Sequence, residues 1–202
     1  AAGESGAASA RRRALVTGAS SGIGEEFARQ LAKKRYDLVL VARQRERLES
    51  IGRGLAEEYG VRVSVLPMDL ADPSAPAELS RELAGREIVL DVLVNNAGIG
   101  VYGFFAETPL ERELETLQVN VVALTHLTKL FLPGMLARRR GRILNVASTA
   151  AFQPGPIMAV YYATKAYVLS LSEALANECA GAGVTVTALC PGFVDTPMTE
   201  FI

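Results

Sequence analysis

The sequence predicts a Rossmann-like, doubly wound α/β fold, in which helices cover both faces of one parallel sheet as three α/β/α layers of a single domain. Short aliphatic runs alternate with longer, charged amphipathic segments along the 202 residues. The aliphatic runs are nearly continuous, which is typical of strands buried on both faces. Glycines and polar residues follow directly after these runs, where sheets of this type bind ligands.

The elements are expected in strict strand–helix alternation. The strands are expected in RALVTG (13–18), YDLVLVA (36–42), VRVSVLPMDL (61–70), LDVLVNNAG (90–98), GRILNVAS (141–148) and GVTVTALCPG (183–192). The helices are expected at Glu25–Arg35, Gln44–Tyr59, Asp72–Ala84, Pro109–Arg138 and Tyr161–Ala180. Asp72 before Pro73 marks the start of the third helix, and Gly141 is expected to close the fourth.

Composition gives no sign of a nucleic-acid or membrane partner. The net charge of −1 gives no electrostatic argument for either partner, and no apolar run approaches the roughly 20 residues of a membrane helix. Cys179 and Cys190 lie at no disulfide or metal-ligand spacing, which favours a reducing, cytoplasmic compartment and no metal site. Residues 1–10 are expected as a flexible tail before one domain at 11–202.

A glycine-rich turn, TGASSGIG, follows the first strand. Gly18 permits a tight turn, Gly22 a close approach of backbone to a pyrophosphate, and Gly24 close packing of the helix on the strand. The N-terminus of that helix offers N–H groups and a positive dipole end to phosphate. No lysine follows Gly24, which argues against an ATPase. The alternative is a turn required only for folding.

The end of the second strand favours NADP(H) over NAD(H). Enzymes that prefer NAD commonly place an acidic residue there to bind the ribose 2′-OH. This chain has Ala42 followed by Arg43, and an arginine can pair with a 2′-phosphate. Ser20 can add a hydroxyl donor. Alternatively, Arg43, Arg45 and Arg47 are the solvated start of a helix, which fits Arg45 best.

Polar residues also end the third and fourth strands. Asp69 can accept a hydrogen bond from an adenine amino group or simply cap a turn. Asn95 is suited to bonding backbone across neighbouring strands, a structural role. Gly98 leaves room for a ribose.

Tyr161 and Lys165 are four residues apart, so on a helix they share one face. A neighbouring ammonium favours the phenolate, so we expect Lys165 to lower the pKa of Tyr161 and make it a general acid/base. Neither Tyr162 nor Tyr167 has a lysine at that spacing. Taken alone, such a pair is more often a surface pair. Ser148, at the end of the fifth strand, can hydrogen-bond a substrate carbonyl or serve only as a turn residue.

Asn120 lies deep within the expected fourth helix among apolar residues, although asparagine is a weak helix former. One interpretation is a local kink with a bound water. The other uses that water as a link in a proton chain from Lys165 to solvent.

Together these motifs resemble the short-chain dehydrogenase/reductase family, in its single-domain, NADP-preferring branch. TGASSGIG, NNAG, Asn120, Ser148 and YYATK occur in that family's order and spacing, and PGFVDTPM matches the segment after its sixth strand. Each motif alone is weak to moderate, but their order is highly specific. The resemblance runs from about Arg13 to Met198, nearly the whole chain.

The resemblance implies a catalytic tetrad of Asn120, Ser148, Tyr161 and Lys165. Ser148 would polarise a carbonyl, Tyr161 would protonate its oxygen, Lys165 would bind the nicotinamide ribose, and Asn120 would hold a relay water. NADPH would supply the hydride. The implied cofactor site comprises Gly18, Ser20, Ser21, Gly22, Ile23, Gly24, Arg43, Asp69, Leu70, Asn96, Ala97, Gly98, Tyr161, Lys165, Pro191, Gly192, Val194 and Thr196.

The resemblance further implies a small carbonyl or alcohol substrate and a homodimer or homotetramer, with dimerisation through the long helix and the Tyr161 helix. Family members usually continue for another strand and helix, whereas this chain stops at Ile202. We therefore expect the substrate pocket to be incomplete. Two alternatives remain, which are a catalytically silent NADP-binding sensor or scaffold and a sugar-nucleotide epimerase or dehydratase.

Overall fold

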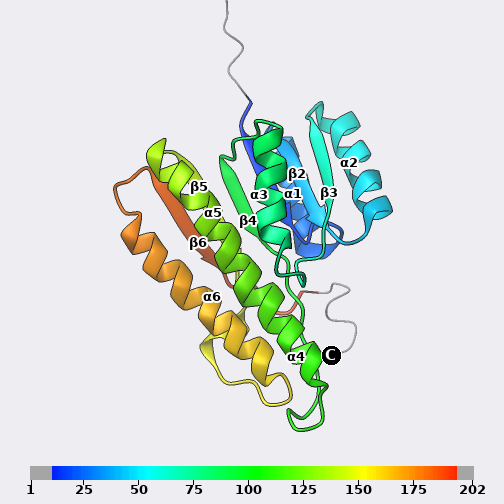
Figure 1. Ribbon diagram of the computed structural model, residues 1–202, viewed down its shortest axis with the longest axis vertical. Coiled ribbons are helices and arrows are strands. Elements are labelled where there is room, and N and C mark those ends of the chain that lie inside the picture. Colours follow the sequence, from blue (N-terminus) through cyan, green and yellow to red (C-terminus); the bar gives the residue numbers. More distant parts are fainter. Residues whose placement is uncertain (1–10, 195–202) are drawn as a thin grey trace, which may run out of the picture.

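The sheet is parallel throughout and reverses its strand order once. The computed structural model describes residues 11–194; the expected tail at 1–10 and Thr196 lie outside the described residues. Six strands pair in the order β3-β2-β1-β4-β5-β6 (Figure 1). They are β1 (Arg13–Thr17), β2 (Asp37–Ala42), β3 (Val63–Pro67), β4 (Val92–Asn95), β5 (Gly141–Val146) and β6 (Val184–Leu189). The order reverses between β1 and β4, which leaves a crevice at the carboxyl ends of these strands. This arrangement confirms the predicted fold class.

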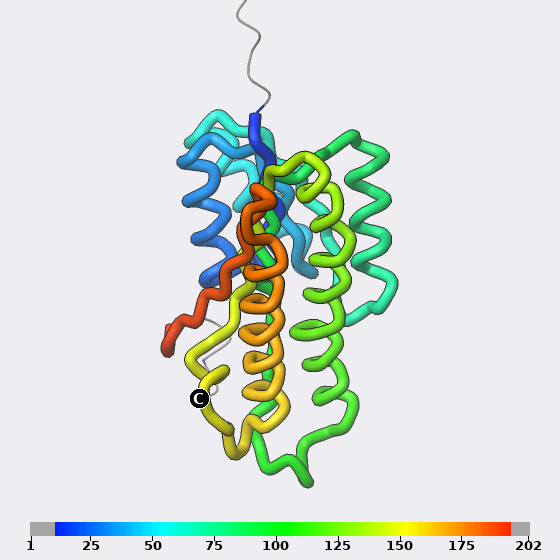
Figure 2. The backbone as a smooth tube through the Cα atoms, turned by 90° about the vertical axis from the view of Figure 1, so that its left-hand side faces the viewer, coloured from blue at the N-terminus to red at the C-terminus, as the bar shows by residue number. Residues whose placement is uncertain are grey.

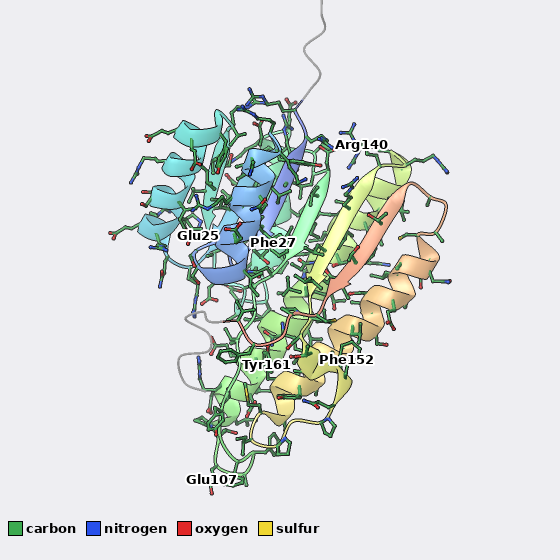
Figure 3. The ribbon with its side chains drawn as sticks, turned by 180° about the vertical axis from the view of Figure 1, so that it is seen from behind. Glu25, Phe27, Glu107, Arg140, Phe152 and Tyr161 are labelled. Carbon is green, nitrogen blue, oxygen red and sulfur yellow. The ribbon has the colours of Figure 1, made fainter. Side chains whose placement is uncertain are left out.

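Helices cover the sheet on both faces. They are α1 (Gly22–Lys33), α2 (Arg45–Tyr59), α3 (Ala75–Gly85), α4 (Leu110–Leu117), α5 (Leu124–Ala137) and α6 (Ala159–Glu178), with a π-helical segment η1 (Gln118–Ala123) and a 3₁₀ turn η2 (Thr149–Phe152). α1 and α2 lie on one face, and α3, α5 and α6 lie on the other (Figures 1 and 3). In Figure 2, the α4–α5 segment runs beside α6 along most of its length.

Alternate residues of the strands supply two separate cores. Leu15 and Val39 face α3 and α5, whereas Val16 and Leu40 face α1 and α2. Strands that must be apolar on both sides read as continuous aliphatic runs, which is why the sequence pattern predicted them. Within residues 11–194, no helix covers β5 and β6 on the α1 side (Figure 3).

The long fourth helix differs from expectation at its middle and at its end. It is helical from Leu110 to Ala137, but η1 interrupts it around Asn120. The prediction that Gly141 closes it is wrong. Arg139 takes the left-handed conformation there (φ 50°), and Gly141 already belongs to β5. Gly141 is needed for packing, because a Cβ there would lie 2.5 Å from the Met135 side chain.

Other boundaries shift by a few residues. α3 begins at Ala75 rather than Asp72, because the Asp72 carboxylate accepts the Ser74 N–H at 2.8 Å and forms a turn before the helix.

One helix among the described residues, Leu110–Ala137, is long and apolar enough to cross a membrane by length and composition alone. Polar residues interrupt its sequence, and here it packs against the sheet and α6. The expectation of no membrane partner stays a prediction.

Candidate active site and nucleotide cleft

One cleft of about 450 Å³ runs along the carboxyl ends of the strands and collects nearly all the predicted site residues. The predicted residues that line it are Gly18, Ser20, Ser21, Gly22, Ile23, Arg43, Asp69, Leu70, Asn96, Ala97, Gly98, Ser148, Tyr161, Lys165, Pro191, Gly192 and Val194. Gly24 and Asn120 lie behind this lining and support it. Glu115 and Tyr162 also line the cleft, although sequence reasoning placed neither there.

The glycine-rich turn has the backbone that its glycines allow. Gly18 and Gly22 have φ values of 64° and 53°, in the left-handed region that favours glycine. A Cβ at Gly24 would lie 2.2 Å from the Gly18 carbonyl oxygen, so only glycine lets α1 approach the turn this closely. Gly22, Ile23 and Gly24 open α1, and their N–H groups have no carbonyl one turn earlier in the helix to bind. The turn can therefore cradle a phosphate.

Two side chains that sequence reasoning did not identify as supports hold this turn. The Asn96 amide donates to the carbonyl oxygens of Thr17 and Gly18 at 3.0 and 3.2 Å. The buried Thr17 hydroxyl accepts the N–H groups of Asn96 and Ala97, both at 3.0 Å. These bonds tie the end of β1 to the segment after β4. Thr17 directly precedes Gly18, and Asn96 lies two residues before Gly98; these positions were the only available signal.

The residues expected at the adenine end behave differently from one another. Arg43 is exposed and forms an ion pair with Glu115 of α4, with 3.9 Å between Nη1 and Oε1. The Asp69 carboxylate accepts the Ala71 N–H at 3.0 Å, as expected for a residue that caps a turn. Asp69 also lines the cleft.

The two further arginines after β2, Arg45 and Arg47, also have different roles. Arg45 pairs with Glu49 on its own helix at 3.6 Å, as expected for a solvated helix start. Arg47 instead donates to the Ser20 carbonyl oxygen at 3.1 Å and pairs with Glu25 at 3.0 Å. Arg47 thus holds the glycine-rich turn from outside, a role that the sequence pattern did not reveal.

Tyr161 and Lys165 lie buried on α6 and face the cleft together. Lys165 Nζ lies 5.5 Å from the centre of the Tyr161 ring and donates to the Val146 carbonyl oxygen at 2.9 Å. Gly100 packs on the Tyr161 ring, where a Cβ would be 3.0 Å away. Figure 3 shows Tyr161 beyond the carboxyl ends of the strands, near Phe152 at the end of η2. Ser148 precedes η2, and its hydroxyl accepts the Ala150 N–H at 3.1 Å.

Burial sets the protonation of this pair. Burial raises the pKa of Tyr161 above its ordinary value, and a hydrogen bond with Ser148 opposes this rise only in part. Burial also lowers the pKa of Lys165 to about 8, with Cys190 acting in the opposite direction. Desolvation is the largest cause of the raised pKa of Tyr161, so the expectation that Lys165 lowers this pKa stays a prediction.

Asn120 acts on the loop after β4. Its amide oxygen accepts the Ile99 N–H at 2.9 Å, and its amide nitrogen donates to the Ile99 carbonyl at 2.8 Å and to Thr164 at 3.0 Å. Thr164 in turn donates to the Tyr161 carbonyl at 2.6 Å. The π-helical segment carries the side chain between this loop and α6, which ties both to one position. The expected kink takes the form of this π segment.

Asn95 has the structural role predicted for it but different partners. Its amide donates to the side chains of Thr128 and Asn145, at 3.0 and 2.9 Å, rather than to backbone. Asn145 continues the chain to Ser172 at 2.9 Å. This buried polar network fixes β4, β5, α5 and α6 together below the cleft.

Comparison with known proteins agrees with this geometry. The model of the short chain dehydrogenase family matches residues 12–202. A very-long-chain 3-oxoacyl-CoA reductase of Phaeosphaeria nodorum is 37% identical over 193 residues, which cover 93% of this chain and 56% of the relative. A very-long-chain 3-oxoacyl-CoA reductase-A of Danio rerio is 35% identical over 191 residues, covering 93% of this chain and 59% of the relative. The chain thus spans somewhat more than half the length of these relatives.

Solved structures share the fold closely. A short-chain dehydrogenase from Sphingobium yanoikuyae in complex with NADPH has a TM-score of 0.88 at 37% identity, covering 93% of this chain and 73% of that one. An L-sorbose reductase from Gluconobacter frateurii, complexed with NADPH and L-sorbose, has a TM-score of 0.86 at 36% identity, covering 93% of this chain and 71% of that one. The family match over most of the chain, together with the fold and the cleft, shows that this protein belongs to the short-chain dehydrogenase family.

Proposed function

We propose that this chain carries the nucleotide-binding and catalytic site of an NADP(H)-dependent oxidoreductase that interconverts a carbonyl compound and an alcohol. One observation carries the proposal: Ser148, Tyr161 and Lys165 meet in the same cleft as the glycine-rich turn. A phosphate-binding turn and an acid/base pair in one cavity are the parts that a nicotinamide-dependent reduction requires. The 3-oxoacyl-CoA reductases and the NADPH-bound structures among the relatives support the same reaction class.

The residues present fit a dinucleotide. The N–H groups that open α1 would hold the pyrophosphate. Asp69 and Leu70 would border the adenine. Lys165 would bind the nicotinamide ribose, because Gly98 leaves space in the cleft beside its Nζ. A Cβ at Gly98 would lie only 3.4 Å from that atom. Asn96, Ala97, Pro191, Gly192 and Val194 line the remaining stretch, and Thr196 is the further proposed contact.

The protein's own groups would handle the proton and the developing charge. A bound nicotinamide supplies or accepts the hydride. The Ser148 hydroxyl would donate to the substrate oxygen as negative charge builds on it. Tyr161, kept protonated by its raised pKa, would pass its hydroxyl proton to that oxygen during reduction. Asn120 would position the loop after β4 and α6, and its part in a water relay remains a prediction.

Arg43 supports the preference for NADP(H). It follows β2 directly, it is exposed to an incoming ligand, and it lines the nucleotide end of the cleft. No acidic residue stands at the end of β2 to bind a free ribose 2′-hydroxyl.

The substrate proposed first is a 3-oxoacyl thioester or another ketone, since both curated relatives described above are named 3-oxoacyl-CoA reductases. NADPH oxidation by the full-length protein over a panel of such ketones tests the proposal. Ser148→Ala is expected to lower kcat about 100-fold or more, whereas Ser170→Ala, an exposed position on α6, should not. A parent protein that binds no nicotinamide nucleotide would contradict the proposal.

We also infer a homo-oligomer, in the cytoplasm, that assembles through α4 and α6. Exposed apolar side chains follow one stripe of α4 at Leu110, Leu114 and Leu117. The hydroxyls of Thr125 and Tyr167 lie 2.9 Å apart on the exposed side, so the helical segments present one shared face. Contiguous exposed apolar surface of this kind marks an interface.

A further inference from the structure

An ion pair spans the nucleotide end of the cleft. Arg43 follows β2, whereas Glu115 lies on α4, and their side chains approach to 3.9 Å. Both residues line the cavity. The Glu115 side chain is 21% exposed and that of Arg43 is 61% exposed, so Glu115 is the more enclosed partner.

Glu115 keeps its place without help from Arg43. Arg112, one turn earlier on α4, forms an ion pair with the other carboxylate oxygen of Glu115. When Arg43 moves toward a ligand, the Glu115 carboxylate keeps its ion pair with Arg112 and stays at the cavity wall.

At this end of the cleft, the Glu115 carboxylate and an incoming 2′-phosphate would both bind to Arg43. The described residues that line the cleft include four charged ones, Arg43, Lys165, Asp69 and Glu115. Lys165 is bound to the Val146 carbonyl at the catalytic end. Arg47, the next basic side chain, is held by Ser20 and Glu25. A 2′-phosphate that reaches Arg43 therefore meets a cation already paired with a carboxylate.

We propose that Glu115 is a specificity-determining residue that competes with the cofactor 2′-phosphate for Arg43. The phosphate must displace the Glu115 carboxylate from the guanidinium and then lie near it, and like charges repel. NAD(H) has no 2′-phosphate and does not meet this competition. Glu115 thus moderates the advantage that Arg43 gives to NADP(H), and it provides a partner for Arg43 each time the cofactor leaves. This inference rests on the proposed NADP(H) function.

Glu115→Gln tests the proposal, because it removes the charge and keeps the shape of the side chain. The dissociation constants of NADPH and NADH are measured by fluorescence titration of the full-length protein, at low and at moderate salt. NADPH is expected to bind about three- to tenfold more tightly, since an exposed ion pair is a weak competitor. NADH should change less than about twofold, and added salt should shrink the difference.

Glu111→Gln is the matched control. Glu111 lies one turn earlier on α4 and is exposed, and the cleft lining does not include it. Glu111→Gln changes the net charge by the same amount as Glu115→Gln, and it should leave the dissociation constants of NADPH and NADH unchanged. Glu115→Ala serves as a second variant, with thermal unfolding to confirm that each protein folds.

The outcomes separate this inference from the proposed function. Unchanged or weaker NADPH binding in Glu115→Gln, in a parent that binds NADPH, overturns the inference alone. Equal tightening of NADH and NADPH also overturns it, because the 2′-phosphate would then play no part. A parent that binds neither nucleotide overturns the proposed function itself.

Discussion

At the scale of single residues, burial determines the protonation of the acid/base pair in the cleft. Burial removes Tyr161 and Lys165 from water, which favours the neutral form of each, a phenol and an amine. Tyr161 therefore has a raised pKa and Lys165 a pKa lowered to about 8. A protonated phenol suits the step in which Tyr161 gives its proton to a carbonyl oxygen.

The lowered pKa of Lys165 predicts a pH-dependent stability. The unfolded state keeps the ordinary pKa of 10.5, while the folded value is about 8. Between these values the unfolded state binds more protons, so the Lys165 contribution to stability rises as pH increases. Urea unfolding measures the free energy of unfolding of the parent and of Lys165→Met. From pH 8 to 10, the value for the parent should rise relative to that for Lys165→Met by about 2 kcal/mol.

The matched control for this measurement is Lys129→Met, an exposed lysine on α5. Its free-energy difference from the parent should stay flat over the same pH range. A flat difference for Lys165→Met as well would mean that Lys165 is not desolvated in the folded protein.

Arg43 is the residue on which the cofactor preference rests. Arg43→Asp replaces the proposed phosphate ligand with an acceptor for a ribose hydroxyl, so the ratio of NADPH to NADH affinity should fall at least tenfold, by about 1.4 kcal/mol or more. Titration of both nucleotides measures the ratio. If the parent binds the two equally, Arg43 does not select the cofactor.

Some of these residues could be predicted from sequence and others could not. The spacing of Tyr161 and Lys165 placed both on one helix face, and the structure agrees. Arg47 and Glu115 carry no local pattern, and Thr17 has only its place before Gly18, because each contacts residues brought close by the sheet order. The pKa of Tyr161 depends on its burial, which the spacing alone cannot give.

At the scale of elements, two helical glycines show the difference between a glycine that close packing requires and one that only lowers helix propensity. Gly24 and Gly54 both lie in helices, but a Cβ at Gly24 would meet the Gly18 carbonyl at 2.2 Å, whereas a Cβ at Gly54 meets nothing within 4 Å. Gly24→Ala should push α1 away from the turn, lower stability by about 1–3 kcal/mol, and weaken nucleotide binding.

Gly54→Ala is the control for that change. It should raise stability by about 0.5–1 kcal/mol, because alanine is the better helix former, and it should leave nucleotide binding unchanged. Chemical denaturation and nucleotide titration measure both quantities. Equal effects of the two substitutions would show that the contact of Gly24 with the turn is unimportant.

The long helix shows the limit of element prediction. Its apolar pattern predicted one helix, and the misfit of Asn120 suggested a kink. The π segment at Gln118–Ala123 depends instead on bonds from Asn120 to Ile99 and Thr164. These partners are distant in sequence, so the pattern indicated the place of the irregularity but not its form.

For the whole molecule, the sheet order explains why one cleft contains the site. Parallel strands end at one edge, so residues after β1, β2, β3, β4 and β5 meet there, and α6 adds Tyr161 and Lys165. The fold class followed from the aliphatic runs and the alternation of elements.

The proposed oligomer is tested at this scale. Leu114→Glu places a charge in the exposed apolar stripe of α4, which should weaken self-association at least tenfold. Sedimentation measures the change, with Val89→Glu as the control because Val89 is equally exposed before β4. A parent that is monomeric at all concentrations would contradict the proposed interface.

The central claim is that Tyr161 is the acid/base of a nicotinamide-dependent reduction. Steady-state NADPH oxidation with the ketone panel, in the full-length protein and its Tyr161→Phe variant, tests it most directly. Tyr161→Phe is expected to lower turnover by about 100-fold or more while NADPH binding stays within about threefold, and Tyr59→Phe, at the end of α2, should match the parent. Full turnover in Tyr161→Phe would contradict the account.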